Sequence, residues 1–290
     1  MANRTKGCIC NSKSSYVGWL FYIRVKALNM STYKIANIVF AINFAINDAW
    51  CQFSTDAEQC DFEVVKENPF YSEYQIYGYK LFPWNCERVF LYDTYTIVVD
   101  KEWEKVSLIS STIRENVSSL LIMIFNTHAV QRHMIQIHSS MIKYFGNGLL
   151  FLGPSGIGKT TMAELWNKYR GALIINGDMN FVQETDECFL GWGTPWHGSS
   201  PYCENTSVPV KALIVLKQAP ENSIRELKDF EKVQLVSNNI IYPTWLEKGM
   251  ELCLETLNHL LSALPVYELS CRPDEEAVRL TEEAVFGGSV

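Results

Sequence analysis

The sequence predicts an α/β (α+β) protein in which a phosphate-loop domain follows a β-rich module. Residues 148 to 163 join an apolar run, a glycine-rich turn and a helix-forming segment, which indicates a strand, a phosphate loop and a helix. Between residues 33 and 99, short apolar stretches with strand-like alternation indicate several further strands. At 290 residues, the chain suits one large domain or a small domain joined to a larger one.

The N-terminal segment, residues 1–29, shows no sustained hydrophobic periodicity, and a second methionine stands at position 30. We expect residues 1–29 to be a disordered extension, with Met30 as a candidate natural start. The β-rich module is expected over residues 30–112, and the phosphate-loop domain over residues 113–290.

The β-rich module contains several stretches with the period of a strand. From Tyr33 to Phe44, apolar side chains alternate with polar or small ones, which predicts one half-buried strand. Further strands are predicted at Phe62 to Val65, Tyr74 to Leu81, Val89 to Tyr92 and Tyr95 to Val99. The many Tyr and Phe residues favour core packing on a sheet, and a binding surface is the alternative.

A helix is predicted before the phosphate loop, because Thr112 and Glu115 have the spacing of a capping box and an apolar stripe follows. It is expected to end near His128 or Arg132, with His128 and His133 at the surface.

A hairpin is predicted directly before the loop. Met134 to Phe145 is strand-like, and Gly146-Asn147 before Gly148 is a two-residue turn signal. If Phe145 faces Gly148, the numbers of opposed residues add up to 293, so His138 lies level with Ser155 at the mouth of the loop.

The phosphate loop matches the pattern G-x-x-x-x-G-K-[ST] through Gly153, Gly158, Lys159 and Thr160. Its glycines allow the backbone N–H groups to point inward, toward the positive end of the following helix. Lys159 supplies a point charge for the β- and γ-phosphates, and Thr160 supplies a hydroxyl for Mg²⁺. The predicted nucleotide-phosphate site consists of Gly153, Pro154, Ser155, Gly156, Ile157, Gly158, Lys159, Thr160 and Thr161.

An acidic turn follows the next predicted strand. Ala172 to Ile175 is apolar and leads into Asn176, Gly177 and Asp178. Phosphoryl transfer needs a Mg²⁺ ligand or a general base at the end of a buried strand, which makes Asp178 a candidate for either role. A plain Asn-Gly-Asp turn is the alternative.

The remaining chain is predicted to contain a hairpin, a loop, a strand and three helices. The loop, Gly191 to Gly198, could cover the nucleotide or receive a substrate through Trp196 and His197, or it could be a structural turn. The other segments are hairpin strands at Phe181 to Val182 and Phe189 to Leu190, a strand at Val210 to Leu216, and helices at Ser223 to Phe230, Leu246 to Leu261 and Asp274 to Val285.

Composition narrows the classes of partner. A net charge of −7 provides no basic field for nucleic acid. The nine cysteines lack the spacing of a disulfide scaffold or a zinc site, which favours reduced thiols and a cytoplasmic location. The apolar run from Val17 to Ile23 is too short to span a bilayer, so no membrane partner is expected.

The order of these motifs resembles the HPr-kinase-like branch of the phosphoenolpyruvate carboxykinase fold, over roughly residues 115–265. The motifs that carry the resemblance are His138-Ser139-Ser140, Gly146-Asn147-Gly148, Gly153 to Thr161, Asn176-Gly177-Asp178, Gly193-Thr194-Pro195-Trp196 and the strand near Leu213. The resemblance implies a mixed sheet around the phosphate loop. It also implies transfer of the γ-phosphoryl group of ATP to a serine or threonine hydroxyl of a protein or peptide.

The same resemblance implies roles for individual residues. Gly153 to Thr161 would bind ATP and Mg²⁺, with Thr160 and Asp178 as metal ligands. Asp178, His138 and Lys159 would be catalytic. Because HPr kinases are oligomers, a homo-oligomer is also left open.

The chain departs from the resemblance at one position, because HPr kinases carry two adjacent Asp residues where this chain has Gly177 and Asp178. Losing a general base slows transfer by about 10²- to 10⁴-fold. The alternative function is therefore an ATP-binding regulatory or accessory protein with lost or weak kinase activity. No C-terminal signature of HPr kinases is evident, so the acceptor is left open, with a precursor of a modified peptide as one option.

Overall fold

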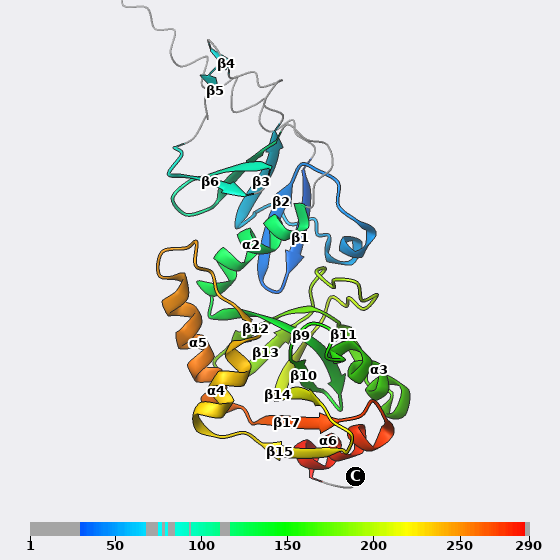
Figure 1. The fold of residues 1–290 in the computed structure, drawn as a ribbon. Helices are drawn as coiled ribbons and strands as arrows, with labels where there is room; N and C mark the ends of the chain where they lie inside the picture. Colours follow the sequence, from blue (N-terminus) through cyan, green and yellow to red (C-terminus); the bar gives the residue numbers. More distant parts are fainter. Residues whose placement is uncertain are drawn as a thin grey trace, which may run out of the picture. The chain divides into compact units, whose positions relative to one another are not determined.

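A computed structural model describes residues 30–67, 75–76, 79–80, 85–92, 94–110 and 117–287 (Figure 1). The expected extension at residues 1–29 and the capping box of Thr112 and Glu115 lie outside these ranges. The chain divides into two compact units. Unit 1 comprises Met1–Ser31, Ala41–Phe44 and Glu63–Ser111, and unit 2 comprises Thr32–Phe40, Ala45–Phe62 and Thr112–Val290.

Unit 1 is built mainly from neighbouring strands, in the order β3, β8, β7 and β6. Their bounds are Phe62–Glu67 for β3, Lys105–Ile109 for β8, Tyr95–Val99 for β7 and Arg88–Tyr92 for β6, and a small pair is formed by β4, Gln75–Ile76, and β5, Tyr79–Lys80. β3 runs parallel to β8, whereas β7 is antiparallel to both β8 and β6. Strands β3, β6 and β7 were predicted from the alternation, and β8 was not.

The single strand predicted from Tyr33 to Phe44 is wrong, because the structure has two strands, β1 (Ser31–Ile35) and β2 (Ile38–Ile42). Ala36 and Asn37 form the turn between them, and Ala36 has a φ of 52°. The buried positions change from odd to even across this turn, from Ile35 to Ile38 and Phe40, so the reversal does break the period of two. The alternation that indicated one strand comes from the residues after the turn. A 3₁₀ helix, η1 (Asp48–Phe53), follows in unit 2.

The main sheet of unit 2 has nine strands, and five of them pair in a closed circuit: β10, β9, β12, β13, β14 and back to β10. The strands are β9 (Met134–Tyr144), β10 (Asn147–Leu152), β11 (Leu173–Asn176), β12 (Met179–Glu184), β13 (Phe189–Trp192), β14 (Ser207–Gln218), β15 (Ser223–Glu226), β16 (Ile240–Ile241) and β17 (Val266–Cys271). β14 is parallel to β10 and β17, and the other pairs are antiparallel. The expected mixed sheet is therefore present.

Five helices accompany this sheet in the described part of unit 2: α2 (Val117–Val130), α3 (Lys159–Arg170), α4 (Asp229–Ser237), α5 (Gly249–Ala263) and α6 (Glu275–Phe286). The helix predicted at Ser223 to Phe230 is wrong, because Ser223–Glu226 forms β15 and α4 begins only at Asp229. Pairing of Ile224 with Leu269 of β17 determines the strand, and local sequence does not reveal that partner. None of the described helices is long and apolar enough to cross a membrane.

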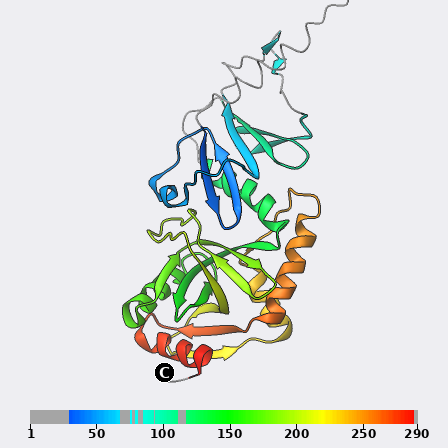
Figure 2. The same cartoon turned by 180° about the vertical axis from the view of Figure 1, so that it is seen from behind.

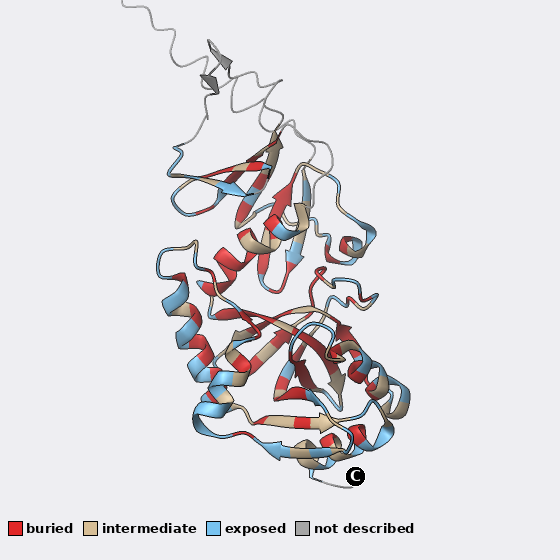
Figure 3. Cartoon of the chain, viewed as in Figure 1, coloured by how far each residue is buried: buried red, intermediate tan, exposed pale blue. Residues whose placement is uncertain are grey.

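Strand β10 is apolar from Leu149 to Leu152 because both of its faces are covered there. Leu150 and Leu152 belong to a buried cluster that includes Leu257 and Leu260 of α5. The alternate residues of β10, such as Phe151, belong to a second cluster that includes α3 and α6. Figures 1 and 2 show α5 and α3 on opposite sides of the sheet, and Figure 3 shows the buried residues concentrated between them. The strand leading into the phosphate loop is thus firmly packed.

Candidate functional site

The candidate site is organised around β9, which changes its neighbours halfway along its length. Up to His138, β9 pairs with β12 on one side and β16 on the other. From Ser139 onward, its neighbours are β10 and β11. The loops that lead out of β10 and β11 therefore leave the sheet close to this changeover point.

The β9–β10 hairpin has a different register from the one expected. Asn147 faces Tyr144, and the numbers of opposed residues add up to 291 throughout the pair. The reason is that Phe145 and Gly146, with φ values of 46° and 76°, form the two-residue turn. The paired residues end at Ser139 and Leu152, so His138 comes level with Gly153, the first residue of the phosphate loop, rather than with Ser155.

The predicted strand, loop and helix are all present. The loop connects β10 to α3, and Gly153, Gly156 and Gly158 have φ values of 139°, 78° and 111°. These left-handed conformations favour glycine, which explains the spacing of the motif. Around Gly156 and Gly158 there is open space, since a Cβ added at either position would meet no atom within 4 Å. The loop thus has the backbone shape of a phosphate cradle, and phosphate binding stays a prediction.

Lys159 begins α3 and is only 7% exposed. Its Nζ donates hydrogen bonds to the carbonyl oxygens of Gly153 at 3.0 Å and Pro154 at 3.3 Å. Burial lowers the pKa of Lys159, and the negative charge of Asp178 partly opposes that shift. The ammonium group is thus held over the loop by carbonyl dipoles and lies within the field of the carboxylate.

The structure brings His138 and Asp178 together. His138 Nε2 lies 3.1 Å from Asp178 Oδ1, and both side chains remain partly exposed, at 25% and 31%. The backbone fixes the same contact, because Ser139 N donates to Asp178 O at 2.9 Å. Asp178 N in turn donates to Asn176 Oδ1 at 2.8 Å. Side chains that are 40 residues apart in the chain therefore form one pair, whose catalytic roles stay predictions.

The acidic turn is also attached to the phosphate-loop helix. Thr160 Oγ1 donates to the carbonyl oxygen of Gly177 at 3.2 Å, and Ser140 Oγ donates to the same oxygen at 2.9 Å. This contact places the Thr160 hydroxyl one residue away from Asp178. A hydroxyl and a carboxylate are ligands that suit Mg²⁺, which usually completes its shell with water and substrate phosphates. The donor set therefore fits the expected metal.

No group of three or more His, Cys, Asp or Glu residues in the described ranges is arranged to hold a metal ion. A Mg²⁺ ion at Thr160 and Asp178 would accordingly take its remaining ligands from the nucleotide and from water.

Gly177 has no room for a side chain. A Cβ at this position would overlap both the Oγ and the Cβ of Ser200. Ser200 is itself buried, and its Oγ accepts a hydrogen bond from Tyr202 N at 3.3 Å. Position 177, where HPr kinases carry the first of two adjacent Asp residues, therefore requires glycine in these surroundings.

The loop after β13 lies against the acidic turn. A Cβ at Gly198 would come within 2.6 Å of Asp178 Oδ2, so the loop backbone passes directly beside the carboxylate. Trp196 does not offer the free stacking surface considered above, since it is 6% exposed, donates from Nε1 to Ser118 O at 3.1 Å and packs on Phe125. His197 Nδ1 contacts the carbonyl oxygen of Ser200. Trp196 is thus part of the core, consistent with the structural alternative.

Sequence reasoning missed two residues at this site and misplaced His128, which lies elsewhere in the fold. Asn239 accepts a hydrogen bond from Gly153 N, and Ser200 fills the space beside Gly177, yet neither belongs to a motif. His128 was expected at the surface but is buried, with its ring stacked 4.4 Å from that of Phe62. These contacts depend on chain segments far apart in sequence, which local patterns do not report.

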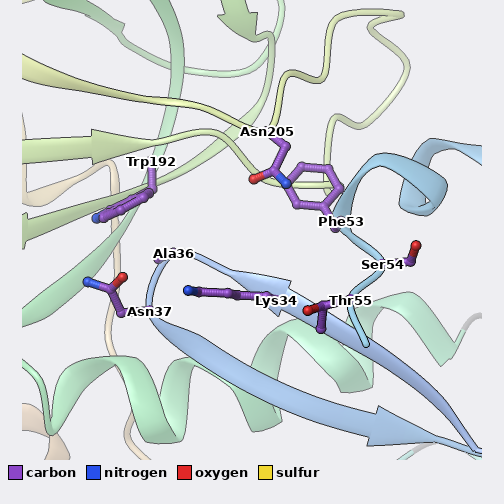
Figure 4. A pocket seen from close by; sticks show the side chains of 8 residues that line it. All are labelled: Lys34, Ala36, Asn37, Phe53, Ser54, Thr55, Trp192 and Asn205. Carbon is purple, nitrogen blue, oxygen red and sulfur yellow. The ribbon is translucent and has the colours of Figure 1, made fainter. Parts of the chain in front are cut away.

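Unit 2 also contains a pocket with a volume of about 320 Å³ that shares no residue with the phosphate loop or the acidic turn (Figure 4). Lys34, Phe53, Trp192 and Asn205 are among its lining residues. The Asn205 amide already donates to Gln52 O at 2.8 Å, and Trp192 Nε1 donates to Gln183 Oε1 at 3.1 Å. Two of its polar lining side chains are thus engaged in structural hydrogen bonds.

Comparison with known proteins shows similarity to proteins in sequence and in structure. No protein-family model matches the chain. Over 111 residues, the chain is 30% identical to the HPr kinase/phosphorylase of Mycoplasmopsis pulmonis (strain UAB CTIP), which covers 34% of this chain and 33% of that relative. The match thus spans about a third of the relative's length. The Hpr(Ser) kinase/phosphatase from Coxiella burnetii matches with a TM-score of 0.33 and 11% identity, over 51% of this chain and 95% of that one. The sequence match confirms the resemblance of this chain to HPr kinases.

Proposed function

We propose that this chain is an ATP-dependent kinase of the HPr-kinase type, which transfers the γ-phosphoryl group of ATP to a serine or threonine hydroxyl of a protein or peptide. The contact between His138 and Asp178 at the level of the phosphate loop carries this proposal. In this proposal, a hydroxyl nucleophile approaches a bound γ-phosphate beside this pair. The relative's name, HPr kinase/phosphorylase, supports the same reaction class.

In this proposal, each residue of the site has a separate role in phosphoryl transfer. The backbone N–H groups of Gly153 to Thr161 bind the phosphates, and Lys159 leaves the carbonyls of Gly153 and Pro154 to neutralise β- and γ-phosphate charge. Thr160 and Asp178 would hold Mg²⁺, which would supply positive charge to neutralise the charge that develops on the transferred group. His138 fixes the orientation of Asp178 through the 3.1 Å contact. The partly exposed carboxylate of Asp178 accepts the proton of the attacking hydroxyl.

A second candidate function, an ATP-binding regulatory or accessory protein, is favoured by one observation. Gly177 has no space for a second carboxylate, so Asp178 alone has to serve as base, as metal ligand or as both. A protein that has lost one of these roles would still bind ATP through the loop and would transfer phosphate slowly or not at all.

The two candidates differ in their response to Asp178→Asn. The full chain is incubated with γ-labelled ATP, Mg²⁺ and hydroxyl-bearing acceptor peptides, and labelled peptide is counted. For a kinase, Asp178→Asn should lower the transfer rate by about 10²-fold or more while ATP still binds. Asp186→Asn, an exposed carboxylate in the β12–β13 turn, should leave the rate unchanged. Tight ATP binding by the natural chain without any transfer would favour the accessory role.

Both candidates require Lys159 to bind phosphate. Lys159→Met keeps the length of the side chain but removes its charge, and should weaken ATP binding by about 10- to 100-fold in calorimetric titrations. Lys168→Met, at the exposed end of α3, is the matched control and should bind like the natural chain. Unchanged affinity in Lys159→Met would contradict both functions.

A further inference from the structure

Asn239 lies directly before β16 and makes two hydrogen bonds that reach the candidate site. Its backbone carbonyl accepts the N–H of His138 at 2.8 Å. Its side-chain Oδ1 accepts the N–H of Gly153 at 2.8 Å. Only 5% of the residue is exposed, so both bonds are shielded from water. One residue thus contacts the strand that carries the histidine and the first residue of the phosphate loop.

The position of Asn239 matters because strand β9 changes its pairing partners there. The β9–β10 ladder ends at Leu152, and the β9–β16 ladder begins with Ile240 facing Ile137. Gly153 N therefore lies just beyond the strand hydrogen bonds of its own sheet. The Asn239 side chain supplies the missing acceptor. A buried N–H left without a partner costs about 1–3 kcal/mol, so the loop is strongly tied to this amide.

Asn239 is itself held firmly in place. Its backbone N–H donates to Val236 O at 2.9 Å, and its Nδ2 donates to Leu235 O at 3.0 Å. Because Nδ2 faces a carbonyl oxygen and Oδ1 faces an N–H, the orientation of the amide is determined by both partners. The side chain therefore connects the C-terminal end of α4 to the first residue of the phosphate loop.

We infer that Asn239 is a positioning residue of the nucleotide site, an inference that rests on the proposed binding of ATP. It touches no phosphate, because its polar atoms are already engaged by Gly153, His138 and α4. It acts through Gly153, whose carbonyl oxygen also accepts from Lys159. Removing the amide releases the first residue of the loop, and with it the alignment of Lys159 and the inward N–H groups.

The first test compares two neighbouring asparagines. Asn239→Ala should raise the Kd for Mg·ATP by about 10-fold or more in calorimetric titrations. Asn238→Ala, at an exposed position that makes no side-chain hydrogen bond with the described residues, should bind like the natural chain. A folded Asn239→Ala with natural affinity overturns the inference.

The second test uses an acceptor-preserving variant and remains informative if Asn239→Ala does not fold. In Asn239→Asp, an ionised carboxylate still accepts from Gly153 N but turns a second oxygen toward Leu235 O, and protonation restores a donor there. Its Kd, divided by that of the natural chain at the same pH, should therefore fall several-fold between about pH 8 and about pH 5. The other charged groups of the site, His138, Lys159 and Asp178, are the same in both proteins, so the ratio removes their effect. A ratio that stays constant, with both proteins folded, overturns the inference.

The outcome for Asn239 is separable from the outcome for the kinase. If the natural chain binds ATP but transfers no phosphate, the kinase proposal fails and both Asn239 tests still apply. If the natural chain transfers phosphate and Asn239→Ala binds ATP unchanged, only the positioning inference fails. A natural chain that does not bind ATP overturns both.

Discussion

Lys159 shows how the phosphate loop is stable without a bound anion. Its buried ammonium group is satisfied by the carbonyl oxygens of Gly153 and Pro154. An incoming phosphate would exchange these neutral acceptors for a charged one, and charge-assisted hydrogen bonds are roughly twice as strong. In the proposed function, the side chain that now binds the loop carbonyls would therefore bind the phosphate instead.

Gly177 and Ser200 lie so close together that a side chain at position 177 depends on the residue at position 200. A double variant tests this dependence. Gly177→Ala should destabilise the protein by about 1–3 kcal/mol, because the new Cβ overlaps the Ser200 side chain. Adding Ser200→Gly removes that obstacle and should recover most of the loss. Urea unfolding of the natural chain, both single variants and the double variant measures the coupling between the two positions. Purely additive effects would show that Ser200 is not the obstacle.

The close approach of Ser200 to Gly177 also affects whether a second carboxylate can be introduced beside Asp178. Gly177→Asp alone should not create a working two-carboxylate turn, since the larger side chain meets the same atoms of Ser200. A gain in phosphoryl transfer is expected only in combination with Ser200→Gly.

At the residue scale, the sequence predicted those contacts that belong to a local motif or a short hairpin. Lys159 and Thr160 were singled out by the loop pattern, and the hairpin placed His138 level with the loop, although the register was two residues out. The contact between His138 and Asp178 was not predicted. Asn239 lies 86 positions from its partner Gly153, and no local pattern reports such a bond. A buried asparagine is recognised only once its neighbours are known.

The β9–β10 hairpin is the element that aims His138, and its turn contains an unfavourable residue. Phe145 has a φ of 46° and is 67% exposed. A bulky side chain in the left-handed region is strained, whereas Asn followed by Gly is the preferred pair for this turn. Phe145→Asn should therefore stabilise the protein by about 0.5–1 kcal/mol, measured as a rise in Tm.

A matched variant identifies the cause of any change at Phe145. Phe145→Val, which introduces a β-branched residue at positive φ, should destabilise the protein. The ring of Phe145 lies 4.3 Å from that of Tyr144, so some packing is lost in both variants. Equal destabilisation in Asn and Val variants would show that this ring contact, and not backbone strain, dominates.

At the element scale, prediction succeeded where a segment's own pattern determines its structure. Strand β10, helix α3 and the β12–β13 hairpin have such patterns, because burial on one or both faces imposes them. The turn at Ala36 was missed because the alternation that follows it, at Ile38, Phe40 and Ile42, was extended back across the turn, although the buried positions change parity there. Strand β17 was missed, and β15 was taken for part of a helix, because their pairing partners, β14 and β17, are distant in sequence.

At the scale of the whole chain, contacts do not follow the order of the sequence. Thr32–Phe40 and Ala45–Phe62 belong to the same compact unit as Thr112–Val290. A boundary read from sequence is a single point in the chain, so it does not describe a unit assembled from separate segments. The functional division into a β-rich module and a phosphate-loop domain stays a prediction.

Stability against acid is a further property of the whole chain, and Glu282 is central to it. Burial alone would raise the pKa of Glu282, but the hydrogen bond from Tyr144 and the hydrogen bond and charge of Arg170 bring its pKa below the usual 4.5. The donors are Tyr144 Oη and Arg170 Nε, each 2.6 Å from a carboxylate oxygen. Burial and the same carboxylate raise the pKa of Tyr144 to about 12. This cluster connects α6 with α3 and β9.

A depressed carboxyl pKa stabilises the folded state above the unfolded pKa, and that stabilisation is lost as the pH falls through the folded value. Glu282→Gln should therefore lower the free energy of unfolding by about 1–2 kcal/mol at neutral pH. The gap to the natural chain should close as the pH falls below the usual value of 4.5. Urea titrations across this range measure the gap, with Glu283→Gln, at a more exposed site on the same helix, as the control. A gap that persists in acid would mean that Glu282 acts through packing. The ionic contribution vanishes once Glu282 is protonated in both the folded and the unfolded state.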